Sequence, residues 1–202
     1  MTDPITFTTV STAADVAEIL ELQAANLPTA LTAETMASQG FVTVRHEPSV
    51  LQRMNDEAPA VIAKAGGHVI GYALVMARSH AADVPILRPL FAVLETLSWR
   101  GSALRDNPRW FVMGQICVAE GYRGRGIVDG LYRTMAEQYR DRFDFTVTDV
   151  ASRNARSLRA HQRVGFETLA VFTDHGTGEE WQVIALDFAA CLARSTRSSG
   201  SR

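Results

Sequence analysis

The stretch Val118-Ala119-Glu120-Gly121-Tyr122-Arg123-Gly124-Arg125-Gly126-Ile127-Val128 decides how this chain folds. An apolar run over residues 110–117 precedes it and indicates a buried strand. In residues 126–140, which follow, apolar side chains recur at the spacing of one helix face. The sequence therefore predicts a strand, a glycine-rich turn and a helix in succession.

That succession favours anion binding. Glycines allow backbone N–H groups to approach an anion closely, and the first N–H groups of a helix carry partial positive charge. Arg123 and Arg125 add two full charges in the same turn. The alternative is an ordinary tight turn with solvated arginines, which Gly-x-Gly alone would favour. The two arginines and the flanking elements favour a phosphate site instead.

Composition narrows the class of protein. A chain of 202 residues suits one domain, expected over residues 1–190, and the Ser/Arg-rich segment 191–202 is expected to be a disordered tail. The formal net charge of -2 gives no indication of a nucleic-acid partner. No apolar run is long enough for a membrane span, and the N-terminus lacks a secretory pattern. Cys117 and Cys191 have no metal-ligand spacing, so no metal is expected and a reducing cytoplasm is the simplest location.

The other segments predict an α+β fold. Hairpins, one of them indicated by Gly66-Gly67 between two apolar runs, alternate with strand–helix–strand crossovers. This order indicates a mixed, mostly antiparallel sheet of six to seven strands with helices on both faces. The crossover from Cys117 to Phe145 predicts a parallel strand pair. Strands are expected at 5–10, 40–46, 60–65, 68–77, 143–150, 166–173 and 180–188, and helices at 13–25, 49–54, 90–99, 126–140 and 154–164.

Residues 78–110 form the least regular segment. A segment of this length without clear strands is often functional, so it is a candidate insertion that walls or covers an acceptor site. A simple covering helix is the alternative.

Two motifs resemble those of the GNAT superfamily of N-acetyltransferases. The family's coenzyme signature, Gln/Arg-x-x-Gly-x-Gly/Ala, is similar to residues 123–128, with Val128 in place of the final small residue. Its second signature, Asn-x-x-Ala/Ser followed by Tyr and Gly-Phe, is similar to residues 154–166, with His161 where many members carry Tyr. The resemblance covers roughly residues 5–188.

The resemblance implies a sheet that splays at its central parallel strand pair and binds acetyl-CoA as the acyl donor. An extended pantetheine arm would pair with the exposed backbone of residues 116–118. The pyrophosphate would lie on the amides of residues 124–128, and the N–H of Val118 would stabilise the oxyanion. The expected coenzyme contacts are Ile116, Cys117, Val118, Arg123, Gly124, Arg125, Gly126, Ile127, Val128, Asn154, Ser157 and His161.

Several individual polar residues have two possible roles. His161 is the candidate acid on the departing thiolate, with a hydrogen-bonded core histidine as the alternative. Asn154 is expected first to cap its helix. Gln115, in an apolar strand, either lines the acceptor pocket or serves the splayed sheet. The sequence does not identify the general base; its candidates are Glu47, His80, Glu95 and Asp149.

The function predicted is an acetyl-CoA-dependent N-acetyltransferase in which a primary amine attacks the thioester directly. A non-catalytic acyl-CoA-binding module on the same fold is the alternative. An unrelated nucleotide-binding protein is disfavoured, because no Gly-Lys-Ser/Thr follows the turn. The acceptor, a small molecule or a peptide amine, is not identified by the sequence, and a homodimer stays open.

Overall fold

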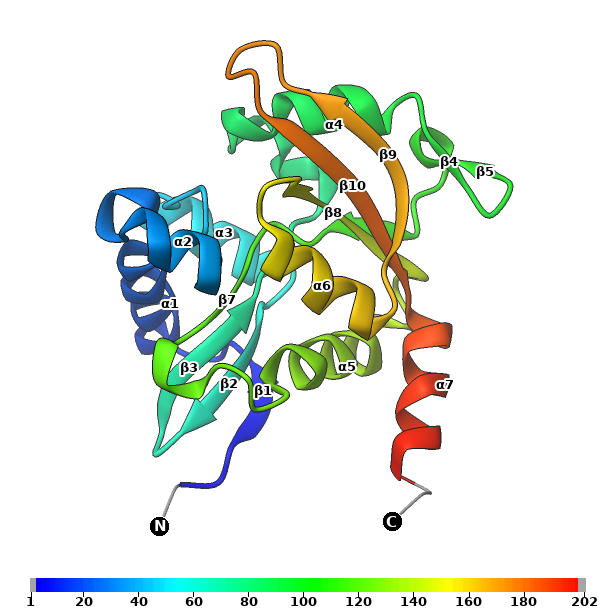
Figure 1. The fold of residues 1–202 in the computed structure, drawn as a ribbon. Coiled ribbons are helices and arrows are strands. Elements are labelled where there is room, and N and C mark those ends of the chain that lie inside the picture. The colour runs from blue at the N-terminus through cyan, green and yellow to red at the C-terminus, as the bar shows by residue number, and fades with distance from the viewer. Residues whose placement is uncertain (1–2, 200–202) are drawn as a thin grey trace.

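The computed structural model describes residues 3–199. Its helices are α1 Ala13–Ala25, α2 Ala33–Gln39, α3 Pro48–Glu57, α4 Arg88–Leu94, α5 Ile127–Tyr139, α6 Ala155–Val164 and α7 Phe188–Ser199 (Figure 1). Its strands are β1 Thr6–Thr9, β2 Val61–Ala65, β3 His68–Ala73, β4 Ser98–Trp99, β5 Ser102–Ala103, β6 Trp110–Val112, β7 Ile116–Val118, β8 Phe145–Ala151, β9 Glu167–Thr173 and β10 Glu180–Asp187.

The main strands form two four-stranded sheets, with orders β1-β2-β3-β7 and β6-β8-β10-β9. Every pairing within them is antiparallel except that of β6 with β8, which is parallel. The predicted α+β class, the mostly antiparallel pairing and the central parallel pair are therefore confirmed. The Gly66-Gly67 turn closes the β2–β3 hairpin with both residues at positive φ, as the sequence predicts.

The two sheets part where the sequence predicted one continuous strand. Over residues 110–112 the chain pairs with β8, and the N–H of Met113 still donates to the carbonyl of Val147. Beyond Met113 the chain loses β8 as a partner. On its other side Val112 is already paired with Met76, just past β3, and β7 pairs with β3 alone. The two strands β6 and β7 thus belong to different sheets, and the last residues of β8 have no neighbour on the β7 side. The predicted splay is confirmed at this position.

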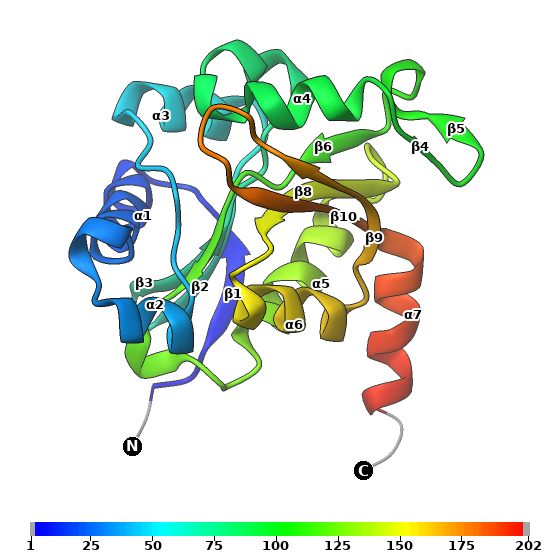
Figure 2. The same ribbon diagram turned by 45° about the horizontal axis from the view of Figure 1, so that its top comes forward.

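Helices cover both faces of the sheets (Figure 2). On one face, α5, α6 and α7 supply buried side chains such as Leu131, Leu158 and Phe188 to the first core. On the other face, α1, α3 and α4 supply a second core that includes Ile19 and Leu51. The same views place α5 and α6 next to each other below the parting of the sheets (Figures 1 and 2).

The strand predicted at residues 40–46 is wrong. Its alternating pattern does bury Val42 and His46, but no strand lies beside it to complete a ladder. Side-chain amides replace that strand, since Gln23 accepts from the N–H of His46 and Gln115 donates to the carbonyl of Val44. This segment, the 40–46 loop, is therefore held in extended form by glutamine and asparagine side chains.

The disordered tail predicted from residue 191 is also wrong for the residues that the structure describes. The helix α7 runs through Ser199, and it begins where the carboxylate of Asp187 accepts from the N–H of Ala190. Phe188 and Cys191 are buried against the first core, so an apolar side of the helix stabilises a segment whose later residues are polar. Residues 200–202 lie outside the described residues.

We predict that Gly130→Ala destabilises the protein. A Cβ at this helical position would meet the ring of Phe7 from β1, with the nearest carbon at 2.2 Å. Overpacking of this kind costs about 1–3 kcal/mol, which exceeds the helix-propensity gain of about 1 kcal/mol. Chemical denaturation of Gly130→Ala, Phe7→Leu and the double variant measures the coupling between the two sites.

The matched control is Gly121→Ala, where a Cβ would meet nothing within 4 Å. Its unfolding free energy is expected to stay near that of the parent. Additive effects of Gly130→Ala and Phe7→Leu would contradict the steric explanation.

Candidate active site

Two cavities meet at the parting of the sheets. The larger, cavity A, has a volume of about 530 Å³ and runs along β7, the glycine turn and the start of α5 to α6. The smaller, cavity B, has a volume of about 130 Å³ and lies towards the end of β8. Both are lined by the same six residues at their junction, which are Phe41, Val42, Ile116, Asn154, Ser157 and His161. The two cavities thus adjoin at the parting.

The glycine turn presents unpaired backbone donors to cavity A. Helix α5 begins after Gly126, which has a left-handed φ of 75° and offers no side-chain cap. No acceptor in the described chain reaches the N–H groups of residues 126–129. The space around Gly124 and Gly126 is open, since a Cβ at either would meet nothing within 4 Å. Free helix N–H groups with open approach are suited to an anion.

Backbone N–H groups of β7 also point towards the parting. Ala119 donates to the carbonyl of Ile70, and Leu74 donates to the carbonyl of Gln115, so residues 115, 117 and 119 face β3. Alternation along an antiparallel strand then directs the N–H groups of Ile116 and Val118 away from β3. An extended ligand lying along β7 would find these groups unpaired.

The residues predicted to contact the coenzyme come together with one exception. Cavity A is lined by Ile116, Cys117, Val118, Arg123, Gly124, Gly126, Ile127, Val128, Asn154, Ser157 and His161. Arg125 is not among the lining residues; it is exposed, and its guanidinium lies 5.4 Å from the ring centre of Tyr122. The thiol of Cys117 is buried, which raises its pKa to about 11 and keeps it neutral.

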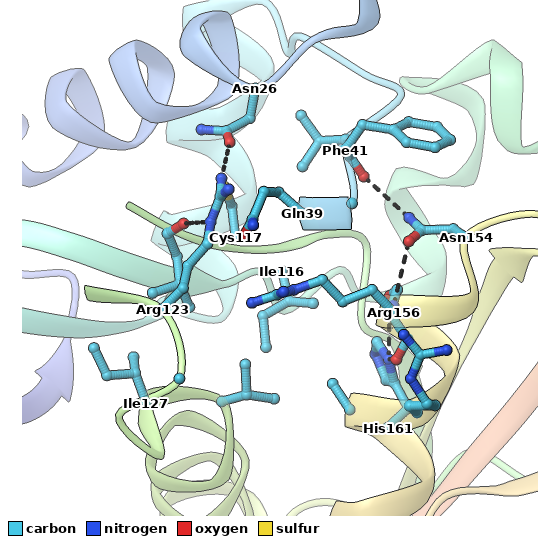
Figure 3. A pocket seen from close by; sticks show the side chains of 18 of the residues that line it. Asn26, Gln39, Phe41, Ile116, Cys117, Arg123, Ile127, Asn154, Arg156 and His161 are labelled. Carbon is cyan, nitrogen blue, oxygen red and sulfur yellow. Dashed lines mark hydrogen bonds between the residues drawn. The ribbon is translucent and has the colours of Figure 1, made fainter. Parts of the chain in front are cut away.

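Arg123 is held at the mouth of cavity A by two hydrogen bonds (Figure 3). Its Nε donates to the carbonyl of Val118 at 3.0 Å, and its Nη2 donates to the side-chain oxygen of Asn26. The guanidinium therefore ties the glycine turn to the end of α1, and it occupies the carbonyl of Val118 but not the N–H of that residue.

Three further arginines line cavity A and were not among the sequence-based candidates. Arg156, Arg159 and Arg163 lie on α6, at spacings of three and four residues that place them along one side of the helix. Arg156 donates to the carbonyl of Ser38, and Arg163 pairs with Asp129. The spacing was visible in the sequence, but only the fold shows that this side of α6 faces the glycine turn.

His161 is enclosed rather than free to titrate. It is 2% exposed, its Nδ1 lies 2.8 Å from the carbonyl oxygen of Ser157, and its Nε2 lies 2.7 Å from the hydroxyl of Tyr132. Nδ1–H thus donates to the carbonyl, and Nε2 accepts from Tyr132. Burial lowers the pKa of His161 to about 4, although the bond to Ser157 acts in the opposite direction. At neutral pH the ring is uncharged, which argues against the imidazolium acid expected from the sequence.

Asn154 caps α6, as the sequence predicts. Its side-chain oxygen accepts from the N–H of Ser157, and its amide donates weakly to the carbonyl of Phe41 in the 40–46 loop (Figure 3). It therefore fixes one wall of the junction to the other. Gln115 lines cavity B, and its amide donates to the carbonyl of Val44.

Of the four candidate bases, only Asp149 lines a cavity at the parting. Glu47 is exposed outside both cavities, and Glu95 lies near Arg78 on the far side of the 78–110 segment. His80 is paired with Glu57 and Asp83, away from the parting. Of the four candidate bases, Asp149 is therefore the one whose position in the fold suits the role.

The three tryptophans also lie in different parts of the fold. Trp99 and Trp110 pack against the ring of Phe145 in the second core, whereas Trp181 lines cavity B. The 78–110 segment contributes to that cavity as well, through Ile86 and Leu87 and the first turns of α4.

A comparison with known protein families identifies the class of protein that has this fold. Residues 29–166, more than half of the chain, match the model of the Acetyltransferase (GNAT) family. The chain belongs to the GNAT acetyltransferase family. No curated protein matches it at significant similarity.

Solved structures share the fold at low sequence identity. A chain of the NatC complex bound to Gag peptide and CoA has a TM-score of 0.61 and 16% identity, over 91% of this chain and 98% of that chain. The protein yncA from Salmonella typhimurium, solved with its cofactor acetyl-CoA, has a TM-score of 0.60 and 18% identity, over 92% and 94%. Ribosomal-protein-alanine N-acetyltransferase from Brucella melitensis has a TM-score of 0.59 and 18% identity, over 90% and 99%.

The described residues, 3–199, hold neither a membrane-spanning helix nor a cluster of metal-binding side chains. No helix there has the length and apolar character needed to cross a membrane. No group of three or more His, Cys, Asp or Glu residues in that part of the chain is arranged to hold a metal ion.

We predict that His161 makes stability depend on pH. Its folded pKa, about 4, lies below the ordinary 6.5, so the unfolded state binds more protons between these values. The stabilisation is complete above about pH 6.5 and is lost as the pH falls towards 4. Denaturation is measured at pH 7 and 4.5 for the parent and for His161→Gln. Between these pH values the unfolding free energy of His161→Gln is expected to fall by about 2 kcal/mol less than that of the parent.

The control is His175→Gln in the exposed β9–β10 turn, which is expected to keep the parent's profile. An equal loss in His161→Gln and the parent would show that the ring is already solvated in the folded state.

Proposed function

We propose that this protein transfers an acetyl group from acetyl-CoA to a primary amine by direct attack of the amine on the thioester. The observation that carries this proposal is the junction of two cavities at the parting of the sheets. One cavity is lined by anion-binding backbone donors, and the other is open to a second substrate. The solved relatives that contain CoA or acetyl-CoA support the choice of donor.

Cavity A fits the coenzyme on three features of its own. Unpaired N–H groups at the start of α5 and open space above Gly124 and Gly126 suit a diphosphate. Arginines on α6 add positive charge beside it. The outward-facing backbone of β7 suits the amides of an extended pantetheine arm. Val128, which replaces the small residue of the family signature, lines the cavity at the second position of the helix.

The chain's own groups would then support the reaction at the junction. The N–H of Val118 donates to the thioester oxygen as charge develops on it, because this group faces the parting and no backbone carbonyl competes for it. The amine nitrogen forms the new bond to the acyl carbon, and the electron pair of the carbon–sulfur bond leaves with the sulfur. His161, in its neutral form, holds α6 against α5 through Tyr132 and so positions the wall of the junction.

We predict that Val118→Pro removes turnover while leaving the fold intact. Proline lacks the N–H group, and at this position the group faces the parting rather than β3. Loss of one oxyanion donor lowers kcat by about 10²–10³-fold. The measurement is steady-state CoA release with a panel of amines, together with coenzyme affinity by titration and thermal unfolding.

Cys117→Pro is the contrasting variant, because the N–H of Cys117 faces β3 by the same register. It is expected to unfold at a lower temperature. A folded Val118→Pro protein with unchanged kcat would refute the role of this donor. Tight coenzyme binding without turnover in the parent would favour the non-catalytic binding module instead.

A further inference from the structure

Cavity B has the features of a selective site for the second substrate. It begins at the junction beside Ile116 and extends along the last residues of β8. The 40–46 loop, the 78–110 segment and the β9–β10 turn enclose it, so three parts of the chain that are distant in sequence build its walls. Its volume of about 130 Å³ is a quarter of that of cavity A, which limits its occupant to a compact group.

The charge in cavity B is negative. Its ionisable lining residues are Asp149 on β8, Asp174 on the β9–β10 turn and His161 on α6. No Lys or Arg of the described chain lines it. Backbone and hydroxyl donors of its own turn, from Gly176 and Thr177, lower the pKa of Asp174 and keep it ionised. With His161 neutral, the cavity attracts a cation and repels a carboxylate.

Asp149 is the ionisable group of cavity B whose carboxylate is not engaged. It follows Val147, the residue at which the parallel ladder with β6 ends, so it stands on the unpaired stretch of β8. No other residue of the described chain donates a hydrogen bond to its carboxylate or pairs with it. A partly buried carboxyl group without a protein partner is costly unless a ligand supplies one.

The surroundings of Asp149 also give its carboxyl group a pKa suited to a general base. Burial raises its pKa to about 7, with its own backbone N–H acting in the opposite direction. A general base is most effective when its pKa lies near the operating pH. A cation bound beside the carboxylate favours the ionised form, which is the form that accepts a proton.

The remaining walls of cavity B are apolar. Leu87 and Leu90 lie on one side, with Phe172 and Trp181 on the other. Ile86, also a lining residue, is 59% exposed, which is unusual for a large aliphatic side chain and places apolar surface at the rim. A substituent that covers these groups would remove them from water.

We infer that cavity B binds a primary ammonium group carried on a compact apolar substituent, and that Asp149 accepts the proton of that ammonium. This inference rests on the proposed acetyl transfer. The proton moves from nitrogen to a carboxylate oxygen of Asp149, and the freed nitrogen lone pair forms the bond to the acyl carbon. The carbon–sulfur electron pair leaves as the thiolate of CoA.

A matched amine panel tests the substrate class. Isoamylamine and leucinamide present an ammonium on a branched apolar chain, leucine adds a carboxylate, and spermidine replaces the apolar chain by further cations. The inference predicts that kcat/KM for isoamylamine and leucinamide exceeds that for leucine and spermidine by at least tenfold. A preference for leucine or spermidine, or no turnover of any of the four by a protein that binds CoA, would overturn it.

Asp149→Asn tests the base. At pH 7.5 kcat is expected to fall at least 100-fold with the Kd of CoA within twofold of the parent. The parent's kcat/KM is expected to rise with pH through a limb near pH 7 that the variant lacks. The variant is expected to be at least as stable as the parent, since an amide removes an unpaired buried charge. Asp141→Asn, at an exposed site, is the control and is expected to keep the parent's kinetics.

The outcomes separate this inference from the proposed function. If the parent neither binds CoA nor releases it with any amine, the proposed acetyl transfer fails. If the parent binds CoA and acetylates an amine, but Asp149→Asn retains its kcat and its pH limb, only the assignment of Asp149 fails. A folded variant that loses CoA affinity along with turnover would also contradict the assignment, because cavity A would then depend on Asp149.

Discussion

The loss of β8 as a hydrogen-bonding partner after Met113 is the constraint on which the rest of the structure depends. Up to Met113 the chain is bonded to β8, and on its other side it is bonded to β3 and the residues that follow β3, from Val112 to Ala119. A continuous ladder between β7 and β8 would pair every backbone group of these strands and leave no space between them. The loss of β8 leaves the side of β7 that faces away from β3 without a neighbouring strand and gives the two cavities a common junction.

Side-chain amides stabilise the parting from one side and helices from the other. Gln23, Gln115 and Asn154 hold the backbone of the 40–46 loop over the junction. Below it, the hydroxyl of Tyr132 on α5 is bonded to His161 on α6. The two cavities that result are electrostatically opposite, with helix N–H groups and arginines in cavity A and carboxylates in cavity B. An anionic donor and a cationic acceptor would therefore approach the junction from different sides.

The sequence predicted the features that local chemistry determines. The glycine turn, the amphipathic helix after it, the Gly66-Gly67 hairpin and the Asn154 cap depend on nearest neighbours, and the structure has each of them. The family motifs added a set of expected coenzyme contacts, and all of these residues except Arg125 line cavity A.

The sequence did not predict what depends on distant neighbours. The 40–46 loop alternates like a strand, but amide side chains from α1 and from the β6–β7 connection replace the missing ladder. The helix at 191–199 depends on burial of Phe188 and Cys191 against α5 and the first core. The fold was also needed to show that His161 is buried, and to distinguish Asp149 from the other candidate bases Glu47, Glu95 and His80. Burial shifts the pKa of a side chain, and residue spacing alone does not reveal burial.

The central claim is that the backbone around the glycine turn and β7 holds the coenzyme. Amide hydrogen exchange, measured with and without saturating CoA and accompanied by a calorimetric titration, tests it most directly. The account predicts a saturable heat of binding and slower exchange at residues 116–118 and 124–129, with little change at β9. No heat of binding, or protection confined to other segments, would contradict it.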